Sequence, residues 1–559
     1  MKPSQIRKIE HIYRRRIPPN KVVTPEIARL LIEISNEIRR QIGILVGRRG
    51  SIEIVIVGDQ RSITIPDLSR YRTGTFRLRG LRLIHTHLQG ELLTQEDLAD
   101  LALLRLDMMV VLSVDGDGFP GFVQSAYLLP NNREKKAWEV NPPVPLGQWE
   151  IDFLRWIQSL EDEFQRGQRS IALKGPGEKA ILLSVSREKR ERLEQSMEEL
   201  KELAQSSGVY VVDSFIQRPQ QISPTTLMGE GKLREILIKC MQLGVDLIIF
   251  DQNLTPGQMT AISDRTELRV LDRTQLILDI FAQRAHTLEG KIQVELAQLK
   301  YMLPRLARKT LALSRLTGGI GGRGPGETKL EIDRRRVRDR IHLLEKELEK
   351  MQKGRVQRRA RRTKTGIPIV SIIGYTNAGK STLFNLLTQS QFLVEDKLFA
   401  TLDPATRRLR FPLKQDWVVT DTVGFIKDLP RDLMVAFRPT FDELQESSLL
   451  IHLVDISNPY FEEHIESVEK ILSELNLDHL TKLLLFNKED KLPPEEVAAI
   501  CRKYKALAIS SLRPKSLGKL FQTIQQKLYL PFARLTNHES FDISDKTFQE
   551  VRPEDGSSS

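Results

Sequence analysis

A short segment in the last third of the chain has the composition of a phosphate-binding loop. It reads Gly374-Tyr375-Thr376-Asn377-Ala378-Gly379-Lys380-Ser381, which matches the pattern GxxxxGK[ST], and it joins an apolar strand-like run at 367–373 to a helical pattern. In this context the glycines let backbone N–H groups turn toward a β-phosphate at the amino end of the helix. We expect Lys380 to contact the β- and γ-phosphates and the Ser381 hydroxyl to bind Mg²⁺. The segment therefore predicts a nucleoside triphosphate site.

Three later segments follow in the order that a GTP site requires. Asp421-Thr422-Val423-Gly424 comes after an apolar run, which places a carboxylate near Mg²⁺ and the Gly424 N–H near the γ-phosphate. Asn487-Lys488-Glu489-Asp490 offers Asp490, which can accept hydrogen bonds from the ring N–H and the amino group of guanine, groups that adenine does not offer. Ser510-Ser511-Leu512 stands where a backbone amide contacts the guanine oxygen, and it matches the usual Ser-Ala-Lys only in part. The order of these segments favours GTP over ATP.

A threonine between the first two segments is the predicted switch residue. The run Phe399-Ala400-Thr401-Leu402-Asp403 offers Thr401, whose hydroxyl can close on Mg²⁺ when the γ-phosphate is present. Thr376 and Thr406 are the alternatives for this role. The predicted catalytic residues are Lys380, Thr401 and Gly424, and the predicted metal ligands are Ser381 and Thr401.

Phe425 stands where many GTPases carry a glutamine that orients the attacking water. A phenylalanine ring cannot hydrogen-bond a water molecule. We therefore expect slow hydrolysis by the isolated protein, or a catalytic group from a large partner. A purely structural interpretation, in which Phe425 packs the switch, is compatible with either.

The elements that position these residues belong to a chain too long for one ordinary domain. At 559 residues, three or four domains are expected. The predicted fold class is multidomain α/β: an extra N-terminal α/β domain, a second α/β domain, a long helical hairpin, and a P-loop GTPase domain with a mixed, mainly parallel sheet covered by helices on both faces. The predicted ranges are 1–180, 181–285, 286–365 and 366–535, followed by a polar tail at 536–559.

The predicted hairpin is rich in arginine. Apolar residues recur at helical spacing over 288–303 and again over 337–351, with the glycine-rich run Gly318–Glu327 between them. Arg334–Lys364 holds 14 Lys and Arg residues against 4 Asp and Glu, which is 14 − 4 = 10 of the chain's net charge of +12. A solvated helix surface is one interpretation, but the guanidinium fork suits phosphate contacts, so we favour nucleic-acid binding.

Composition also bears on the compartment. No apolar run approaches the roughly 20 residues of a membrane-spanning helix, and no signal-peptide core follows the first residues. The chain has 2 cysteines, too few for a disulfide framework. We expect a monomeric cytoplasmic protein, with partial membrane association left open.

These motifs resemble the HflX family of ribosome-associated P-loop GTPases over roughly residues 181–535. The most specific matching segments are Val270–Phe281, Glu289–Ala297 and Gly318–Glu327, together with the Phe399–Asp403 and Asp421–Phe425 switches. The resemblance implies GTP hydrolysis with Mg²⁺, binding to the 50S subunit, the 70S ribosome and ribosomal RNA, and splitting or rescue of stalled ribosomes. A ribosome-assembly GTPase is the alternative. Residues 1–180 exceed the family's usual N-terminal portion.

The extra N-terminal segment contains a histidine pair. Ile84-His85-Thr86-His87, with Thr94 and Asp97 after it, resembles the zinc site of JAMM-type metallopeptidases, in which Glu53 would be the acid–base residue. Two imidazoles and a carboxylate can hold Zn²⁺ with an open water position. Because the interval to Asp97 is one residue short and Thr94 replaces serine, an ordinary strand-end pair is the favoured interpretation. A metallopeptidase with a regulatory GTPase module is the remaining alternative function.

Overall fold

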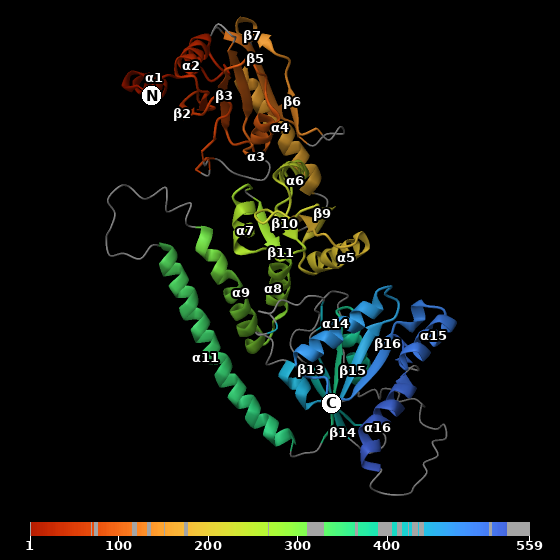
Figure 1. Cartoon of the computed structure of the whole chain (residues 1–559). Helices are drawn as coiled ribbons and strands as arrows, with labels where there is room; N and C mark the ends of the chain where they lie inside the picture. Colours follow the sequence, from red (N-terminus) through yellow and green to blue (C-terminus); the bar gives the residue numbers. More distant parts are fainter. Residues whose placement is uncertain are drawn as a thin grey trace, which may run out of the picture. The chain divides into compact units, whose positions relative to one another are not determined.

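The computed structural model describes residues 2–66, 68, 70–71, 77–114, 120–130, 136–149, 151–172, 177–266, 268–309, 329–363, 367–388, 405–410, 416–422, 424–426, 434, 441–513 and 517–533 (Figure 1). Three predicted features lie outside these residues: the Gly318–Glu327 loop, the Phe399–Asp403 switch and the tail at 536–559. By compactness the chain divides into one unit of residues 1–350 with 430–436 and a second of 351–429 with 437–559. The five predicted domains remain a prediction.

The first unit opens with a mixed sheet that, within the described residues, has seven strands in the order β2-β1-β3-β4-β5-β6, with β7 beside β5. The pair β3–β4 is parallel and the other neighbours are antiparallel. The elements are α1 (Pro3–Ile12), α2 (Pro25–Ile38), β1 (Ile42–Gly47), β2 (Ile52–Val57), β3 (Leu81–His87), α3 (Gln95–Leu103), β4 (Met108–Val114), β5 (Pro120–Leu128), β6 (Trp138–Val140), β7 (Val144–Pro145), η1 (Leu146–Gln148) and α4 (Phe153–Ala172).

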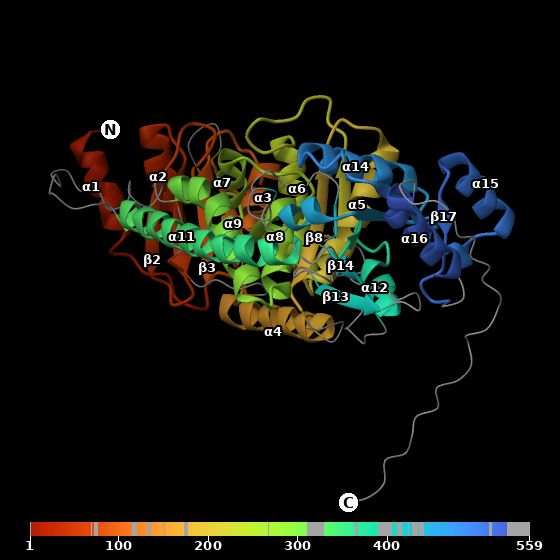
Figure 2. The same cartoon turned by 90° about the horizontal axis from the view of Figure 1, so that it is seen from below.

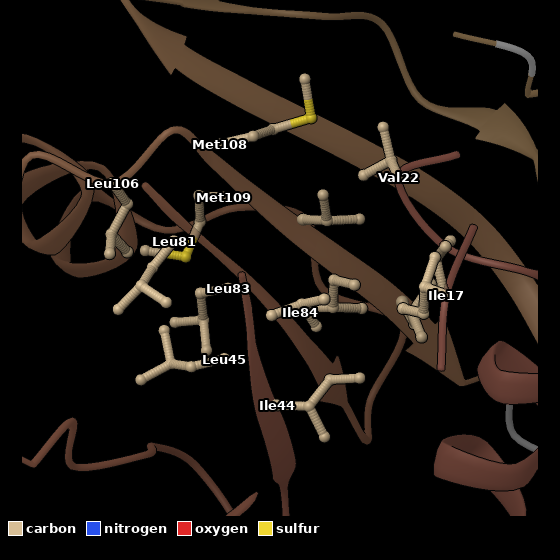
Figure 3. Packing of buried hydrophobic residues seen from close by; sticks show 14 of the residues in the cluster. Ile17, Val22, Ile44, Leu45, Leu81, Leu83, Ile84, Leu106, Met108 and Met109 are labelled. Atoms are coloured by element: carbon tan, nitrogen blue, oxygen red, sulfur yellow. The ribbon is translucent and has the colours of Figure 1, made fainter. Parts of the chain in front are cut away.

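The core of this sheet follows from its strand sequences. Strands β3 and β4 are buried along their whole length because both of their faces are covered. Leu45 of β1 stands opposite Leu83 of β3, and Ile44 stands opposite Ile84. Met109 of β4 stands opposite Leu83, so Leu45, Leu83 and Met109 share one face of the sheet, whereas Ile44 and Ile84 share the other; Figure 3 shows both sets, which belong to the apolar core. Burying that many aliphatic side chains, at about 1.5–3 kcal/mol each, fixes the register of β3.

The same unit holds a second, parallel sheet in the order β11-β10-β8-β9. Alternating strands and crossover helices predicted this arrangement, and the structure confirms it. The elements are β8 (Lys179–Val185), α5 (Arg190–Ser206), β9 (Tyr210–Gln217), α6 (Glu230–Leu243), β10 (Leu247–Phe250), α7 (Pro256–Ser263), β11 (Arg269–Asp272) and α8 (Arg273–Arg284).

A buried ionic network holds the junction of β11 and α8. The guanidinium of Arg273 donates to Asp251 at 3.0 Å and to Glu199 at 2.5 Å. Asp272 caps α8 by accepting from the Gln275 N–H at 2.9 Å. The hydroxyl of Tyr301, on the next helix, also donates to Asp272. These contacts give the Val270–Phe281 segment a structural role.

Two long helices follow, α9 (Leu288–Lys309) and α11 (Lys329–Thr363), as predicted from the apolar spacing. They lie side by side in both views (Figures 1 and 2). Ion pairs link them, between Arg340 and Glu295 at 2.7 Å and between Lys300 and Glu345 at 2.7 Å. Leu344 of α11 is fully buried, so this helix packs through its apolar stripe.

The second unit is a P-loop fold whose sheet, in its described residues, has six strands in the order β13-β14-β12-β15-β16-β17. Only β13 runs antiparallel to its neighbour, which confirms the predicted mixed, mainly parallel sheet. The elements are β12 (Ile369–Gly374), α12 (Lys380–Thr388), β13 (Ala405–Arg410), β14 (Asp416–Asp421), η2 (Asp442–Glu446), β15 (Leu449–Asp455), α14 (Phe461–Glu474), β16 (Lys482–Asn487), η3 (Glu489–Lys491), α15 (Pro494–Tyr504), β17 (Leu507–Ala508) and α16 (Leu517–Ala533).

Candidate nucleotide-binding site

The predicted phosphate loop connects the end of β12 to the start of α12, and two of its glycines have conformations that side chains rarely adopt. Gly374 has a φ of 152°, and a Cβ there would lie 2.1 Å from the Leu453 carbonyl oxygen. Gly379 has a φ of 91°, and a Cβ there would lie 2.3 Å from the Asn487 side-chain nitrogen. The loop therefore requires glycine at both positions so that its backbone can lie against β15 and β16.

Lys380 begins α12 and turns its side chain back into the loop. Its Nζ donates to the Tyr375 carbonyl oxygen at 2.8 Å, and a Cβ on Gly424 would stand 3.0 Å from the same Nζ. Burial lowers the pKa of this ammonium to about 8, while the charge of Asp421 opposes the change. The structure thus brings the predicted Lys380 and Gly424 together around a buried cation suited to an anionic ligand.

Ser381 and Asp421 form the predicted oxygen pair. The Ser381 hydroxyl donates to Asp421 Oδ2 at 3.0 Å, because Asp421 ends β14 and stands opposite Ile372 of β12. Thr422 lies next to it, and its hydroxyl donates to the Ile372 carbonyl oxygen at 2.7 Å. A hydroxyl and a carboxylate at this distance are the ligand types that Mg²⁺ prefers. Val423 lies outside the described residues.

Asn487 ties three predicted segments into one site. Its amide nitrogen donates to the Ala378 carbonyl oxygen at 2.8 Å. Its amide oxygen accepts from the Ser511 N–H at 3.0 Å and from the Ser511 hydroxyl at 2.9 Å. Lys488 adds a bond from its Nζ to the Asn377 carbonyl oxygen at 3.0 Å. The phosphate loop and the two base-recognition segments are therefore fastened by side chains.

The residues predicted to recognise the guanine base lie in the segments that follow β16 and β17. A hydrogen bond from Ser510 lowers the pKa of Asp490, so this carboxylate is ionised and able to accept hydrogen bonds. The N–H of Glu489 donates to the Ile509 carbonyl oxygen at 3.2 Å. The Leu512 side chain is 77% exposed, and its N–H lies 3.4 Å from the Ser510 hydroxyl. An ionised carboxylate beside a backbone turn suits guanine.

Phe425 is part of the core. Its N–H donates to the Gly374 carbonyl oxygen at 3.1 Å, its carbonyl oxygen accepts from the Thr376 N–H at 2.8 Å, and its fully buried ring stacks on Phe441. The ring therefore has a packing role in the core, which agrees with the structural interpretation of Phe425. Thr376, one alternative switch residue, is buried with its hydroxyl making no hydrogen bond. Thr406, the other, lies exposed on β13.

Two residues at the site had no sequence signal. The ring of His464, on α14, stacks on Tyr375 of the phosphate loop with centroids 3.8 Å apart. Asp455, at the end of β15, pairs with Lys488 at 2.8 Å. Neither residue belongs to a motif that the sequence shows. The end of β15 is where an open parallel sheet places ligand contacts, so recognising that strand would have pointed to Asp455.

Comparison with known proteins agrees with this geometry. Residues 194–282, 284–362 and 369–488 match the family models described as GTP-binding GTPase N-terminal, GTP-binding GTPase Middle Region and 50S ribosome-binding GTPase. "GTPase HflX" of Caldanaerobacter subterraneus is 44% identical over 374 residues, covering 67% of this chain and 84% of that protein. The chain belongs to the HflX family of GTPases. It is accordingly an enzyme that hydrolyses GTP.

One more relative and one solved structure are similar to this chain. "GTPase HflX" of Escherichia coli is 41% identical over 356 residues, covering 63% of this chain and 83% of that protein. A GTP-binding protein from Sulfolobus solfataricus, solved in complex with GDP, is 24% identical with a TM-score of 0.35, covering 64% of this chain and 100% of that one. The three family models leave residues 1–193 unmatched. Within the described residues, no helix is long and apolar enough to cross a membrane.

The structure also places the residues of the predicted N-terminal cluster. His85, His87 and Asp97 come together at the end of β3. Glu53 lies elsewhere. Its carboxylate accepts a hydrogen bond from the Ser51 hydroxyl and lies next to Gly47 of β1. Gly47 stands opposite Leu81, at the beginning of β3. Four residues of strand, about 13 Å, separate that position from His85. Glu53, the predicted acid–base residue, is therefore not at the cluster.

Proposed function

We propose that this HflX-family protein is a ribosome-associated factor that binds the 50S subunit in its GTP-bound form and splits or rescues stalled ribosomes. The observation that carries the proposal is a basic helix, α11, attached to a GTP site in one chain. The family model matching residues 369–488 is described as a 50S ribosome-binding GTPase, which supports the same partner. We place the activity in the cytoplasm and treat the protein as a monomer.

The charge of α11 supports RNA as the surface that it contacts. Arg335, Arg336 and Arg338 are exposed, whereas Leu344 and Leu348 are buried. The apolar stripe thus packs inward and leaves arginines toward solvent. A helix of 35 residues is about 50 Å long, enough to follow an RNA groove over many phosphates.

The residues of the GTP site fit a magnesium nucleotide. Ser381 and Asp421 present oxygen atoms 3.0 Å apart, and Thr401 is the predicted third contributor. Bound Mg²⁺ would neutralise charge that develops on the phosphates. Lys380 would hold the β- and γ-phosphates, and the Gly424 N–H would donate to the γ-phosphate. Since the ring of Phe425 is fixed in the core, a group that orients water has to come from elsewhere, which agrees with activation by a large partner.

Sedimentation of 70S ribosomes with the protein and GTP, GDP or a non-hydrolysable analogue tests the proposal. We expect co-migration with 50S subunits and loss of the 70S peak with the analogue, and neither with GDP. Ser381→Ala should abolish both effects, and Arg336→Glu together with Arg338→Glu should weaken binding while leaving basal GTP hydrolysis intact. Equal binding with GDP and the analogue would refute the switch. Binding confined to immature 50S particles would favour a ribosome-assembly role.

A further inference from the structure

A second cluster of chemically capable side chains lies in the N-terminal sheet, outside the ranges of the three family models that match this chain. The Nε2 atoms of His85 and His87 are 3.1 Å apart. Asp97 Oδ1 lies 3.3 Å from His85 Nε2, and Asp97 Oδ2 lies 3.6 Å from His87 Nε2. Among the described residues, these three side chains form a group whose ligand atoms all lie within 4.8 Å of one another. Two imidazole nitrogens and the two oxygens of one carboxylate therefore converge on one point.

The fold enforces this convergence. His85 and His87 are two residues apart on β3, so their side chains leave the same face of the strand. Strand β3 is fixed on both edges, by β1 and by β4, which leaves it no freedom to shift. The pair lies at the carboxyl end of the parallel β3–β4 pair, the end at which open sheets collect ligands.

Asp97 is held in place by the first turn of α3. The N–H and the hydroxyl of Thr94 both donate to Asp97 Oδ2 at 2.8 Å, and the Asp97 N–H bonds back to the Thr94 hydroxyl at 3.2 Å. This capping box fixes the carboxylate side chain and leaves Oδ1 directed at His85. Thr94 thus acts on Asp97 as a positioning residue.

We propose that His85, His87 and Asp97 form a binding site for a divalent transition-metal ion, with zinc as the best fit. In a tetrahedral zinc site with bonds of about 2.0–2.1 Å, neighbouring ligand atoms are about 3.3 Å apart. The Nε2–Nε2 separation of 3.1 Å, and the separations of 3.3 Å from His85 Nε2 to Asp97 Oδ1 and 3.6 Å from His87 Nε2 to Asp97 Oδ2, fall around that value. Two imidazoles and one carboxylate are also a donor set that suits zinc.

The surroundings favour a cation with an open coordination position. The His85 and His87 side chains are buried, while 14% of the Asp97 side chain is exposed, which leaves access from solvent. Three protein ligands leave a fourth position for water or another donor. Because Glu53 lies at the other end of the strand, the proposal concerns metal binding and not peptide hydrolysis.

Zinc titration of the full-length protein tests this site independently of the ribosome. The purified chain is stripped with a chelator, dialysed against Zn²⁺ and measured by elemental mass spectrometry, and we expect about one zinc per chain. His87→Ala and Asp97→Asn should lose that zinc. Thr94→Val, which removes a positioning contact, should weaken affinity by about 10–100-fold. His479→Ala, which removes an exposed histidine of the second unit, is the matched control and should keep the zinc.

Two further measurements keep the test decisive. Co²⁺ in place of Zn²⁺ should give the strong visible absorption of a four-coordinate site in the wild type and in His479→Ala, and lose it in Asp97→Asn. Circular dichroism and GTP hydrolysis, which should be unchanged in Asp97→Asn, show that the fold and the second unit are intact. A wild-type chain that binds no zinc would show that the cluster is only a His85–Asp97 ion pair. Zinc that persists in both His87→Ala and Asp97→Asn would show that the metal binds elsewhere in the chain. Either of these two results overturns the proposal.

Discussion

Nucleotide binding by the phosphate loop should take up a proton near pH 8. Burial lowers the pKa of Lys380 to about 8 from its ordinary value of 10.5, so the free protein holds this lysine partly neutral at that pH. The phosphates of a bound nucleotide favour the ammonium and raise the pKa again. At pH 8 about half of the lysines are neutral before binding, against about one tenth at pH 7. Binding should therefore take up about 0.5 proton at pH 8 and about 0.1 at pH 7.

The same pKa fixes the sign of the effect on stability. The folded pKa lies below the unfolded one, so the fold disfavours the ammonium, and this cost is present in full below pH 8. It is lost as the pH rises from about 8 to about 10.5. A fall in pKa from 10.5 to about 8 corresponds to about 3 kcal/mol. A bound anion beside Lys380 would offset this cost.

Isothermal titration calorimetry with GDP measures the proton uptake. Titrations at pH 7 and pH 8 are repeated in buffers of different ionisation enthalpy, and the slope of the observed enthalpy gives the protons taken up. Lys470→Met, which removes an exposed lysine of α14, is the control and should keep the uptake. Lys380→Arg should abolish it, because arginine stays charged. Absence of uptake by the wild type at pH 8, or an unchanged uptake in Lys380→Arg, would refute the reasoning.

Three other substitutions have definite expected outcomes. Gly379→Ala should reduce nucleotide affinity by more than about tenfold, because the added methyl group clashes and the backbone has a strained φ, which together cost about 1–3 kcal/mol; titration calorimetry measures this loss. Gly518→Ala, in an open part of α16, should instead stabilise the fold by about 0.5–1 kcal/mol, which thermal melting measures. Phe425→Gln should destabilise by about 1–3 kcal/mol without accelerating GTP hydrolysis, because the amide would be buried; faster hydrolysis would contradict this. Arg273→Ala should cost about 3–5 kcal/mol in urea unfolding, and a loss below 1 kcal/mol would argue against the buried network.

The sequence predicted the parts of the GTPase fold that carry a local signature. The phosphate loop lies between β12 and α12 as expected, and the sequence segments around 417–419 and 482–486 are strands of the same sheet. Strand β15, which lies next to β12, was not predicted. Its sequence Leu449–Asp455 is apolar along most of its length but contains His452, and a central strand buried on both faces shows no alternation of polar and apolar residues.

Contacts between distant segments were beyond what spacing could predict. The Asn487 bonds to Ala378 and Ser511 join segments that the motif order implied, so their meeting was expected although the bonding atoms were not. The stack of His464 on Tyr375 had no such guide. It depends on α14 lying over the loop, which follows from how the sheet is assembled and not from a pattern in either segment.

The histidine cluster shows a contact that the sequence interval did not decide. The short interval between His87 and Asp97 favoured an ordinary strand-end pair, which stays a prediction; the structure shows that Asp97 nevertheless reaches both His85 and His87. The residues between the end of β3 and the start of α3 cover the distance to the cluster, whereas the direction of the Asp97 side chain is set by its capping box with Thr94. What matters for ligation is the position of Asp97 within the helical turn, and that position depends on the N-cap rather than on loop length.

The helix that carries Asp97 also joins the extra N-terminal sheet to the region where the HflX match begins. Helix α3 packs on α6, Leu103 of α3 contributes to the core of the second sheet, and Ile238 of α6 contributes to that of the first. Asp100, one turn after Asp97, has its pKa raised by burial to about 6 while Arg234 of α6 opposes the change. A helix that packs on α6 and contributes to the core between the two sheets cannot reorient without disturbing both cores. The added sheet is therefore built into the first unit through the helix that bears the proposed metal ligand.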